Sequence, residues 1–275
     1  MTTTLTVDVA DELVALACRV AREAGLMAAA GRRNGVERAD TKSSATDMVT
    51  EFDHASERLI VDRLLAARPH DGVLGEEGAA AAGSSGVRWV IDPIDGTTNF
   101  LYGLPSWGVS IAATDALGTI VGAVFVPSSG EMFAAVRGAG ATLDGVTIRA
   151  GGCTELSSAL VATGFGYAAE RRRRQGARVA ALLPHVRDIR RLGAASVDLC
   201  YVAAGRIDAY YEEGLGVWDF AAGELIARES GCLTGDFGGG PPSSLEVAVA
   251  NPALFPQLRR VLAATSMHSA WADSA

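Results

Sequence analysis

Residues 88–100 read RWVIDPIDGTTNF, and this stretch decides how the rest of the chain is interpreted. The apolar residues 89–91 fit a buried strand, which would end at Asp92. A proline and an isoleucine separate Asp92 from Asp95, and the proline restricts Asp92 to an extended backbone. Gly96 follows at once and permits a tight turn with close approach of a ligand. Two carboxylates held this close repel each other unless a positive charge lies between them.

The residues after this turn favour the start of a helix. Thr97, Thr98 and Asn99 are common at such starts, where the backbone N–H groups point outward. Carboxylates suit hard divalent cations such as Mg²⁺, and N–H groups at a helix start suit phosphate. A metal beside a phosphate is the arrangement used in phosphoryl chemistry. A bare Asp-x-x-Asp-Gly could be an ordinary surface turn, but the agreement of its neighbours along the whole stretch favours a site.

The composition is that of a globular, acidic chain. The 275 residues are 49% hydrophobic and 20% charged, and the formal net charge is -8, so general binding to nucleic acid is disfavoured. The four cysteines are far apart and form no Cys-x-x-Cys motif, which argues against a zinc site or a disulfide framework. The N-terminus lacks the basic region of a secretory signal, and no apolar run reaches the ~18 residues of a membrane span. We therefore expect a cytoplasmic protein with no role at a membrane.

The first half of the chain shows helical periodicity and then strand periodicity. It predicts an amphipathic helix over residues 8–32 and a second helix over 54–69 that Asp53 would cap. The Gly- and Ala-rich stretch 78–86 is expected to be a mobile loop, and its composition would permit closure over a substrate. From 109 to 148, short segments separated by glycine turns predict an antiparallel sheet.

The pattern changes near residue 150, after which strands alternate with helices as in a second α/β half. We expect an N-terminal α+β half over 1–150 that carries most of the metal ligands. A C-terminal α/β half over 151–275 would complete the site, and the two halves should form one structural unit.

Four segments of the sequence resemble segments of one known family. DPIDGTTNF (92–100) looks like the first signature of the inositol monophosphatase family, and VWDFAAGELIARESG (217–231) looks like its second. KSSATDMVTEFD (42–53) and LGEEG (74–78) are similar to two further family segments, and all four stand in family order. The resemblance implies an α/β (α+β) fold: a layered α/β/α/β/α sandwich of the inositol monophosphatase and fructose-1,6-bisphosphatase type.

The resemblance also implies that two or three Mg²⁺ ions share one site. Glu76, Asp92 and the backbone carbonyl of Ile94 would hold the first ion. The second would be held by Asp92, Asp95 and Asp219, and a third, weaker ion would lie near Glu76 with mostly water ligands. Ions of this charge would make the closely spaced aspartates tolerable. Lithium inhibits the family, and we expect it to inhibit this protein.

The catalytic roles implied by the resemblance centre on one threonine. The N–H groups of Gly96 and Thr97 would bind phosphate oxygens. The Thr97 hydroxyl, hydrogen-bonded to Asp53, would orient the attacking water beside Glu76. Lys42 either helps to neutralise the phosphate or is a plain surface lysine, and the sequence leaves both open.

The resemblance places three further residues against the alcohol part of the substrate. These are Gly193, Ala195 and Glu212, and the ion ligands Asp95 and Asp219 would also contact the substrate. The chemistry implied is hydrolysis of a phosphate monoester, with inositol 1-phosphate as the first candidate. Histidinol phosphate, 3′-phosphoadenosine 5′-phosphate and fructose 1,6-bisphosphate are the alternatives.

Two details leave the exact alcohol open. Glu212 and Glu213 are adjacent, and Glu212 is chosen only by counting back seven residues from Asp219. Gly216 stands where the best-known family members have a histidine. The sequence DGTTNF followed by LYGLP fits the inositol branch better than the histidinol branch, which often has a lysine after the first threonine.

Two other interpretations compete with this one. Haloacid-dehalogenase phosphatases have an Asp-x-Asp-Gly-Thr motif, but the aspartates here are three apart. The run ERRRRQ (170–175) could bind an anionic substrate, RNA or polymerase through Arg171–Arg174. A solvated helix start or part of a dimer surface is the favoured interpretation of the run. A homodimer is expected from the resemblance, and nucleic acid is not an expected partner.

Overall fold

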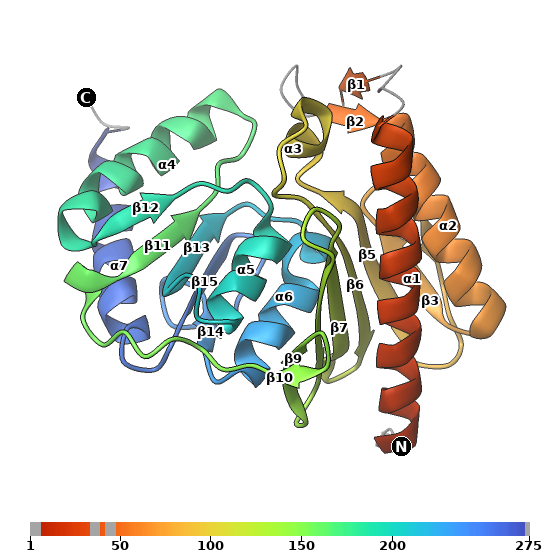
Figure 1. Cartoon of the computed structure of the whole chain (residues 1–275). Coiled ribbons are helices and arrows are strands. Elements are labelled where there is room, and N and C mark those ends of the chain that lie inside the picture. The colour runs from red at the N-terminus through yellow and green to blue at the C-terminus, as the bar shows by residue number, and fades with distance from the viewer. Residues whose placement is uncertain (1–6, 34–38, 42–47, 273–275) are drawn as a thin grey trace.

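The computed structural model describes residues 7–33, 39–41 and 48–272. Two β-sheets and three helical layers make up the fold (Figure 1). The larger sheet contains β3 (Gly72–Gly75), β4 (Ala80–Ala81), β5 (Arg88–Asp95), β6 (Gly108–Asp115), β7 (Gly118–Val126), β8 (Glu131–Val136), β9 (Gly140–Leu143) and β10 (Val146–Thr147). The smaller contains β11 (Leu160–Thr163), β12 (Asp188–Arg190), β13 (Ala209–Glu213), β14 (Leu233–Gly235) and β15 (Glu246–Ala250). A separate antiparallel pair joins β1 (Ala39–Thr41) and β2 (Met48–Thr50).

The helices form layers on and between the two sheets. They are α1 (Val7–Arg33), α2 (Glu51–Ala67), α3 (Thr97–Tyr102), α4 (Ala169–Leu182), α5 (Ala195–Ala203), α6 (Val217–Glu229) and α7 (Phe255–Ala272), with 3₁₀ turns η1 (Leu156–Ser158) and η2 (Leu183–His185). Helices α1 and α2 cover the outer face of the larger sheet, and α4 and α7 lie outside the smaller one (Figure 1). Helices α5 and α6 lie between the sheets. This is the α/β/α/β/α order that the resemblance implies.

The strand order agrees with the predicted change of pattern. In the larger sheet β5 to β10 are antiparallel neighbours in sequence order, as the glycine-punctuated segments predict, whereas β3 and β5 run parallel. In the smaller sheet β11 runs parallel to β12 and β13, and β15 runs antiparallel to β13 and β14. The predicted boundary at 150 falls between β10 and β11. That the two halves form one unit stays a prediction.

Strand β5 does not end at Asp92, as the sequence suggested, but continues to Asp95 through a bulge. Asp92 pairs with Ser110 and Asp95 pairs with Gly108, and the register shifts between them. Pro93 lies in the irregular segment, where the missing N–H of proline removes no ladder hydrogen bond. The bulge therefore redirects the strand at the point where the carboxylates are presented.

Helix α2 begins earlier than predicted, so the expectation that Asp53 is its N-cap is wrong. Thr50 is the N-cap and accepts a hydrogen bond from Phe52 N, at 3.2 Å. Asp53 lies in the first turn and accepts the Thr50 N–H at 2.7 Å, which completes a capping box. Ser56 on the same helix donates its hydroxyl to the Pro93 carbonyl at 3.0 Å. The start of α2 thus supports the bulge in β5.

The predicted loop 78–86 contains a short edge strand that its small residues did not reveal. Strand β4 pairs with β3, and the N–H groups of Ser84 and Ser85 both donate to the His70 carbonyl at 2.8 and 3.0 Å. Ser85 also donates its hydroxyl to Asp71 at 2.6 Å. Closure of this loop over a substrate stays a prediction.

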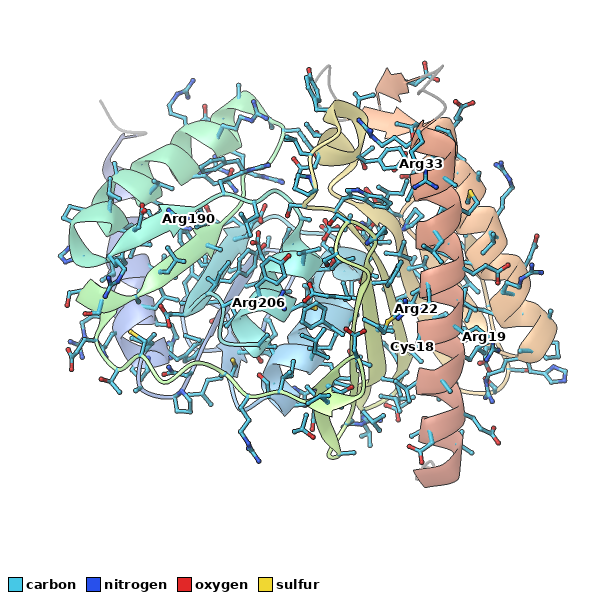
Figure 2. All side chains as sticks on the ribbon, viewed as in Figure 1. Cys18, Arg19, Arg22, Arg33, Arg190 and Arg206 are labelled. Carbon is cyan, nitrogen blue, oxygen red and sulfur yellow. The ribbon has the colours of Figure 1, made fainter. Side chains whose placement is uncertain are left out.

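The middle layer joins the two sheets through packing and one ion pair. One buried cluster contains Phe133 from the larger sheet, Leu225 from α6 and Tyr210 from the smaller sheet. Arg206 (Figure 2) pairs with Glu131 across this boundary, and its guanidinium lies over the rings of Phe133 and Tyr201. The helix that carries Asp219 is therefore held firmly against both sheets.

Replacing Gly122 with alanine is expected to destabilise this packing. A Cβ on Gly122 would lie 2.7 Å from the Ala222 carbonyl oxygen and 2.9 Å from its Cα, so β7 and α6 would have to separate. The expected loss is about 1–3 kcal/mol in the free energy of unfolding, measured by urea titration. Gly176→Ala on α4 is the matched control, since nothing lies within 4 Å of its Cβ position. An equal loss in both variants would contradict the packing argument.

Candidate functional site

Three carboxylates from distant parts of the chain meet at one end of the larger sheet. Glu76 directly follows β3, and its N–H donates to the Ile91 carbonyl at 3.1 Å, which places it beside Asp92 on β5. Asp219 comes from the first turn of α6. One oxygen of each of Glu76, Asp92 and Asp219 lies within 4.8 Å of the other two. The structure thus brings together three of the residues expected to hold metal ions.

The electrostatics of this cluster favour a cation. Burial is the main cause that raises the pKa of Asp92 well above its ordinary value, and the nearby Glu76, Asp95 and Asp219 raise it further. The pKa of Asp219 is raised for the same reasons, burial first and then Glu76 and Asp95. A divalent cation among these oxygens would remove the repulsion and bring both pKa values down. Closely spaced, partly buried carboxylate oxygens are the donors that Mg²⁺ accepts, so the residues fit such an ion.

Asp219 is fixed by the backbone around it. The Gly216 N–H donates to Asp219 Oδ2 at 2.7 Å. Ser110 on β6 donates its hydroxyl to the Trp218 carbonyl at 3.2 Å, which ties the start of α6 to the larger sheet. Asp219 is thereby fixed in the first turn of α6, and the neighbouring strand sets its direction.

Asp95 is held by the start of α5. Its Oδ1 accepts the Ala195 N–H at 3.2 Å, and its Oδ2 accepts the Ser196 N–H at 2.7 Å and hydroxyl at 2.6 Å. Burial raises the pKa of Asp95 to about 6, although the Ser196 and Ala195 hydrogen bonds oppose the rise. Asp95 is not a member of the three-carboxylate group. A carboxylate has about four acceptor positions, so these hydrogen bonds leave Asp95 able to bind another group. The contacts expected between Asp95 and an ion or the substrate stay predictions.

A short chain of hydrogen bonds links the turn after β5 to α2. The Thr97 hydroxyl lies 3.1 Å from Asp53 Oδ1 and 3.1 Å from the Ile94 carbonyl oxygen. Asp53 is fully buried, and its Oδ2 accepts both the N–H and the hydroxyl of Thr50. The hydrogen bond predicted between Thr97 and Asp53 is therefore present. The hydroxyl has one proton for two acceptors, so its oxygen stays able to accept a bond from another group.

Gly96 adopts the conformation that the tight turn requires. Its φ is +91°, which disfavours residues with a side chain. A Cβ at this position would also lie 3.0 Å from the Ser106 carbonyl oxygen and 3.1 Å from the Gly193 carbonyl oxygen. Gly193 itself has a φ of +97°. The turn expected to bind phosphate and the loop expected to face the alcohol thus touch each other.

Glu212 and Glu213 have different partners in the structure. The two residues alternate along β13, and Glu213 pairs with the buried Arg178 at 2.6 Å. Glu212 accepts the Tyr210 hydroxyl at 2.6 Å. Burial raises the pKa of Glu212 to about 7, while the Tyr210 hydrogen bond and two nearby arginines, Arg191 and then Arg171, act in the opposite direction. Contacts of Gly193, Ala195 and Glu212 with an alcohol stay predictions.

Two residues that support the site were not predicted from the sequence, and one predicted residue lies outside the described part of the chain. Ser196, the strongest partner of Asp95, was not singled out. Glu57 on α2 was also missed: it accepts the N–H groups of Glu77 and Ala79 at 2.9 Å each and so fixes the segment that carries Glu76. Neither has a local sequence signal, since Ser196 binds the distant Asp95 side chain and Glu57 binds distant backbone. Lys42 lies outside the described residues.

Comparison with known proteins agrees with the resemblance. The model of the inositol monophosphatase family matches residues 9–273. The chain belongs to the inositol monophosphatase family. Inositol-1-monophosphatase SuhB of Mycobacterium tuberculosis is 46% identical over 245 residues, which are 85% of this chain and 83% of the relative. Nus factor SuhB of Pasteurella multocida is 43% identical over 227 residues, 82% of this chain and 85% of the relative.

The fold is shared with solved members of the inositol monophosphatase family. The crystal structure of extragenic suppressor protein suhB from Bartonella henselae has a TM-score of 0.86 at 33% identity. The match covers 91% of this chain and 98% of that one. Family membership makes the chain a phosphomonoester hydrolase of a metal-dependent family, and its acidic cluster could bind a metal. Among the described residues no helix is long and apolar enough to cross a membrane.

Proposed function

We propose that the protein hydrolyses a phosphate monoester of a polyol in a Mg²⁺-dependent reaction, with inositol 1-phosphate as the first candidate. The observation that carries this proposal is the cluster of Glu76, Asp92 and Asp219, whose oxygens lie within 4.8 Å of one another. The name of the M. tuberculosis relative supports the choice of inositol 1-phosphate. Histidinol phosphate, 3′-phosphoadenosine 5′-phosphate and fructose 1,6-bisphosphate remain alternatives for the same chemistry.

The metal ligands that we propose follow the family pattern. Glu76, Asp92 and the Ile94 carbonyl would hold one Mg²⁺. Asp92, Asp95 and Asp219 would hold the second, and a third ion near Glu76 stays a prediction. When bound, Mg²⁺ supplies Lewis-acid chemistry: it activates water and offsets the negative charge of the phosphate.

The chain's own residues would bind the phosphate and orient the water. The N–H groups of Gly96 and Thr97 at the start of α3 would hold phosphate oxygens. The Thr97 hydroxyl donates toward Asp53 or the Ile94 carbonyl, so its oxygen can accept a hydrogen bond from the attacking water. Glu76 would accept the proton that this water gives up. Water would attack phosphorus in line with the ester P–O bond, which breaks as the new P–O bond forms, and the departing alkoxide would take a proton from solvent water. No covalent enzyme intermediate is therefore required.

The test is phosphate release from a panel of monoesters. Inositol 1-phosphate, histidinol phosphate, 3′-phosphoadenosine 5′-phosphate and fructose 1,6-bisphosphate are each assayed with Mg²⁺, with EDTA, and with Mg²⁺ plus Li⁺. We expect turnover with Mg²⁺, no turnover with EDTA, and reduced turnover with Mg²⁺ plus Li⁺. If another ester is hydrolysed fastest, the proposed chemistry stands and the protein is assigned to a different substrate branch of the family. No turnover of any ester by Mg²⁺-binding protein would refute the proposal.

The competing interpretations receive less support. An aspartyl-phosphate, which a haloacid-dehalogenase phosphatase would form, is not expected to be trapped. Arginines of the run Arg171–Arg174 are engaged within the chain: Arg172 donates to the Gly166 carbonyl, and Arg173 pairs with Glu170. Relatives from several organisms are named Nus factor SuhB, but these contacts do not favour a nucleic-acid role. The homodimer and the cytoplasmic location stay predictions.

A further inference from the structure

Asn99 is a buried residue beside the site to which the proposed function gives no role. It is the third residue of α3 and is only 5% exposed. Its side-chain Nδ2 donates to the Ser106 carbonyl at 2.5 Å and to the Leu192 carbonyl at 2.7 Å. Both N–H groups of the amide are thus engaged, and two carbonyl acceptors fix which end of the amide is the nitrogen. Asn99 therefore joins α3 to two separate loops.

The hydrogen bond to Leu192 crosses from the N-terminal half of the chain to the C-terminal half. Leu192 lies in the loop 191–194, which joins β12 of the smaller sheet to α5. Among the described residues, the Asn99 amide makes the only side-chain hydrogen bond to this loop. We call 191–194 the alcohol loop, because Gly193 lies in it and Ala195 directly follows it. The position of the alcohol loop therefore depends on Asn99.

The alcohol loop meets the residues after β5 without space for side chains. A Cβ on Gly193 would lie 2.9 Å from Asn99 Nδ2. A Cβ on Gly96 would lie 3.1 Å from the Gly193 carbonyl oxygen and 3.0 Å from the Ser106 carbonyl oxygen, which is the other acceptor of Asn99. Asn99 thus holds both of the segments that contact Gly96, whose N–H is proposed to bind phosphate.

We infer that Asn99 is a positioning residue that sets the spacing between the phosphate turn, Gly96–Thr97, and the alcohol loop. This inference rests on the proposed function and deepens it, because that spacing decides which alcohols can contact the loop while their phosphate stays on the turn. The amide suits this role, since it donates two hydrogen bonds and adds no charge to a site rich in carboxylates. A shift of the alcohol loop would weaken its contacts with the alcohol. The phosphate turn would stay in place, because the Thr97 hydroxyl ties it to α2.

The experiment compares two esters in the wild type and in variants, all with Mg²⁺. One is the ester of the panel that the wild type hydrolyses fastest. The other is ethyl phosphate, whose ethyl group has no hydroxyl for the alcohol loop to contact. Wild-type kcat/KM is expected to be higher for the panel ester. Asn99→Ala removes both hydrogen bonds and should lower that preference by about tenfold, mainly through KM, while kcat/KM for ethyl phosphate stays within about twofold of the wild type.

The matched control is Asn251→Ala. Asn251 is also buried, and its Nδ2 donates to the backbone carbonyls of Gly151 and Cys153 at 2.8 and 2.7 Å. None of these residues belongs to the proposed site. Both alanine variants should unfold at lower urea concentration than the wild type, but Asn251→Ala should keep the wild-type preference between the two esters. If Asn99→Ala does not fold, Asn99→Ser replaces it, because the shorter serine cannot reach both carbonyls.

The outcomes separate this inference from the proposed function. An equal fall of kcat/KM for both esters in Asn99→Ala would overturn the inference while the phosphatase proposal stands, because Asn99 would then support the turn or the whole fold. So would equal wild-type kcat/KM for the two esters, or an unchanged preference in Asn99→Ala.

If the wild type hydrolyses no ester, the proposed function fails and calorimetric binding decides the inference alone. The probes are inositol 1-phosphate and ethyl phosphate, each with Mg²⁺. Tighter wild-type binding of inositol 1-phosphate that is lost in Asn99→Ala and kept in Asn251→Ala would support the inference. Equal wild-type affinities, or an unchanged difference in Asn99→Ala, would overturn it.

Discussion

Asp92→Asn is expected to lower kcat by about three orders of magnitude, which corresponds to about 4 kcal/mol of lost transition-state stabilisation. Asp92 is the one side chain proposed to contact both ions, and it is only 1% exposed, so water cannot take its place. Asparagine keeps the shape and the acceptor for the Ile94 N–H, which Asp92 Oδ1 accepts at 3.1 Å. The loss should therefore come from charge and metal binding and not from misfolding. The measurement is kcat across a Mg²⁺ titration.

The control for this variant is a carboxylate of similar chemistry outside the site. Asp188→Asn on β12 removes a charge that pairs with Arg190 at the surface, and its turnover should stay near that of the wild type. Calorimetry should show Mg²⁺ binding in the wild type and in the Asp188 variant, and weakened binding in Asp92→Asn. Wild-type Mg²⁺ affinity in Asp92→Asn would contradict the ligand assignment even if kcat fell.

The sequence predicted the parts of the site that local chemistry determines. The motif around Asp92 combines a strand, two carboxylates, a proline that fixes its own φ and a glycine that permits the tight turn. Asp219 belongs to the second family-like segment, VWDFAAGELIARESG. Their meeting with Glu76 was expected from the family resemblance, because no local pattern places residues 143 positions apart (Glu76 and Asp219) side by side.

What the sequence could not predict depends on distant backbone. The bulge in β5 follows from pairing with β6, and a strand read by itself has no register. Ser196 binds Asp95 only because α5 is packed between the sheets, and Glu57 binds a segment twenty positions away. Arg171 and Arg173 belong to the same charge run, but they have different partners in the structure. Arg171 donates to the Gly214 carbonyl, whereas Arg173 pairs with Glu170.

The metal-free protein is expected to lose stability as the pH rises from about 4 to about 7. The pKa of Asp95 is raised by burial from 3.8 to about 6, and that of Glu212 from 4.5 to about 7. In this window the folded state binds more protons than the unfolded state, so the free energy of unfolding falls with pH. At 1.36 kcal/mol for each unit of pKa, Asp95 by itself accounts for a loss on the order of 3 kcal/mol. The ion-paired Asp115 and Glu131 have lowered pKa values and act in the opposite sense at lower pH.

Mg²⁺ should reverse this loss, because it binds the deprotonated carboxylates of the folded state. At a concentration of about 100 times its Kd, it would add about 2.7 kcal/mol to the free energy of unfolding. Urea unfolding at pH 5 and pH 8, each with EDTA and with Mg²⁺, measures both effects. The metal-free protein should be less stable at pH 8 than at pH 5, and Mg²⁺ should stabilise it mainly at pH 8. Asp92→Asn should lose most of the Mg²⁺ increment. Greater metal-free stability at pH 8, or an equal Mg²⁺ increment in Asp92→Asn, would mean that these buried carboxylates do not form the ion site.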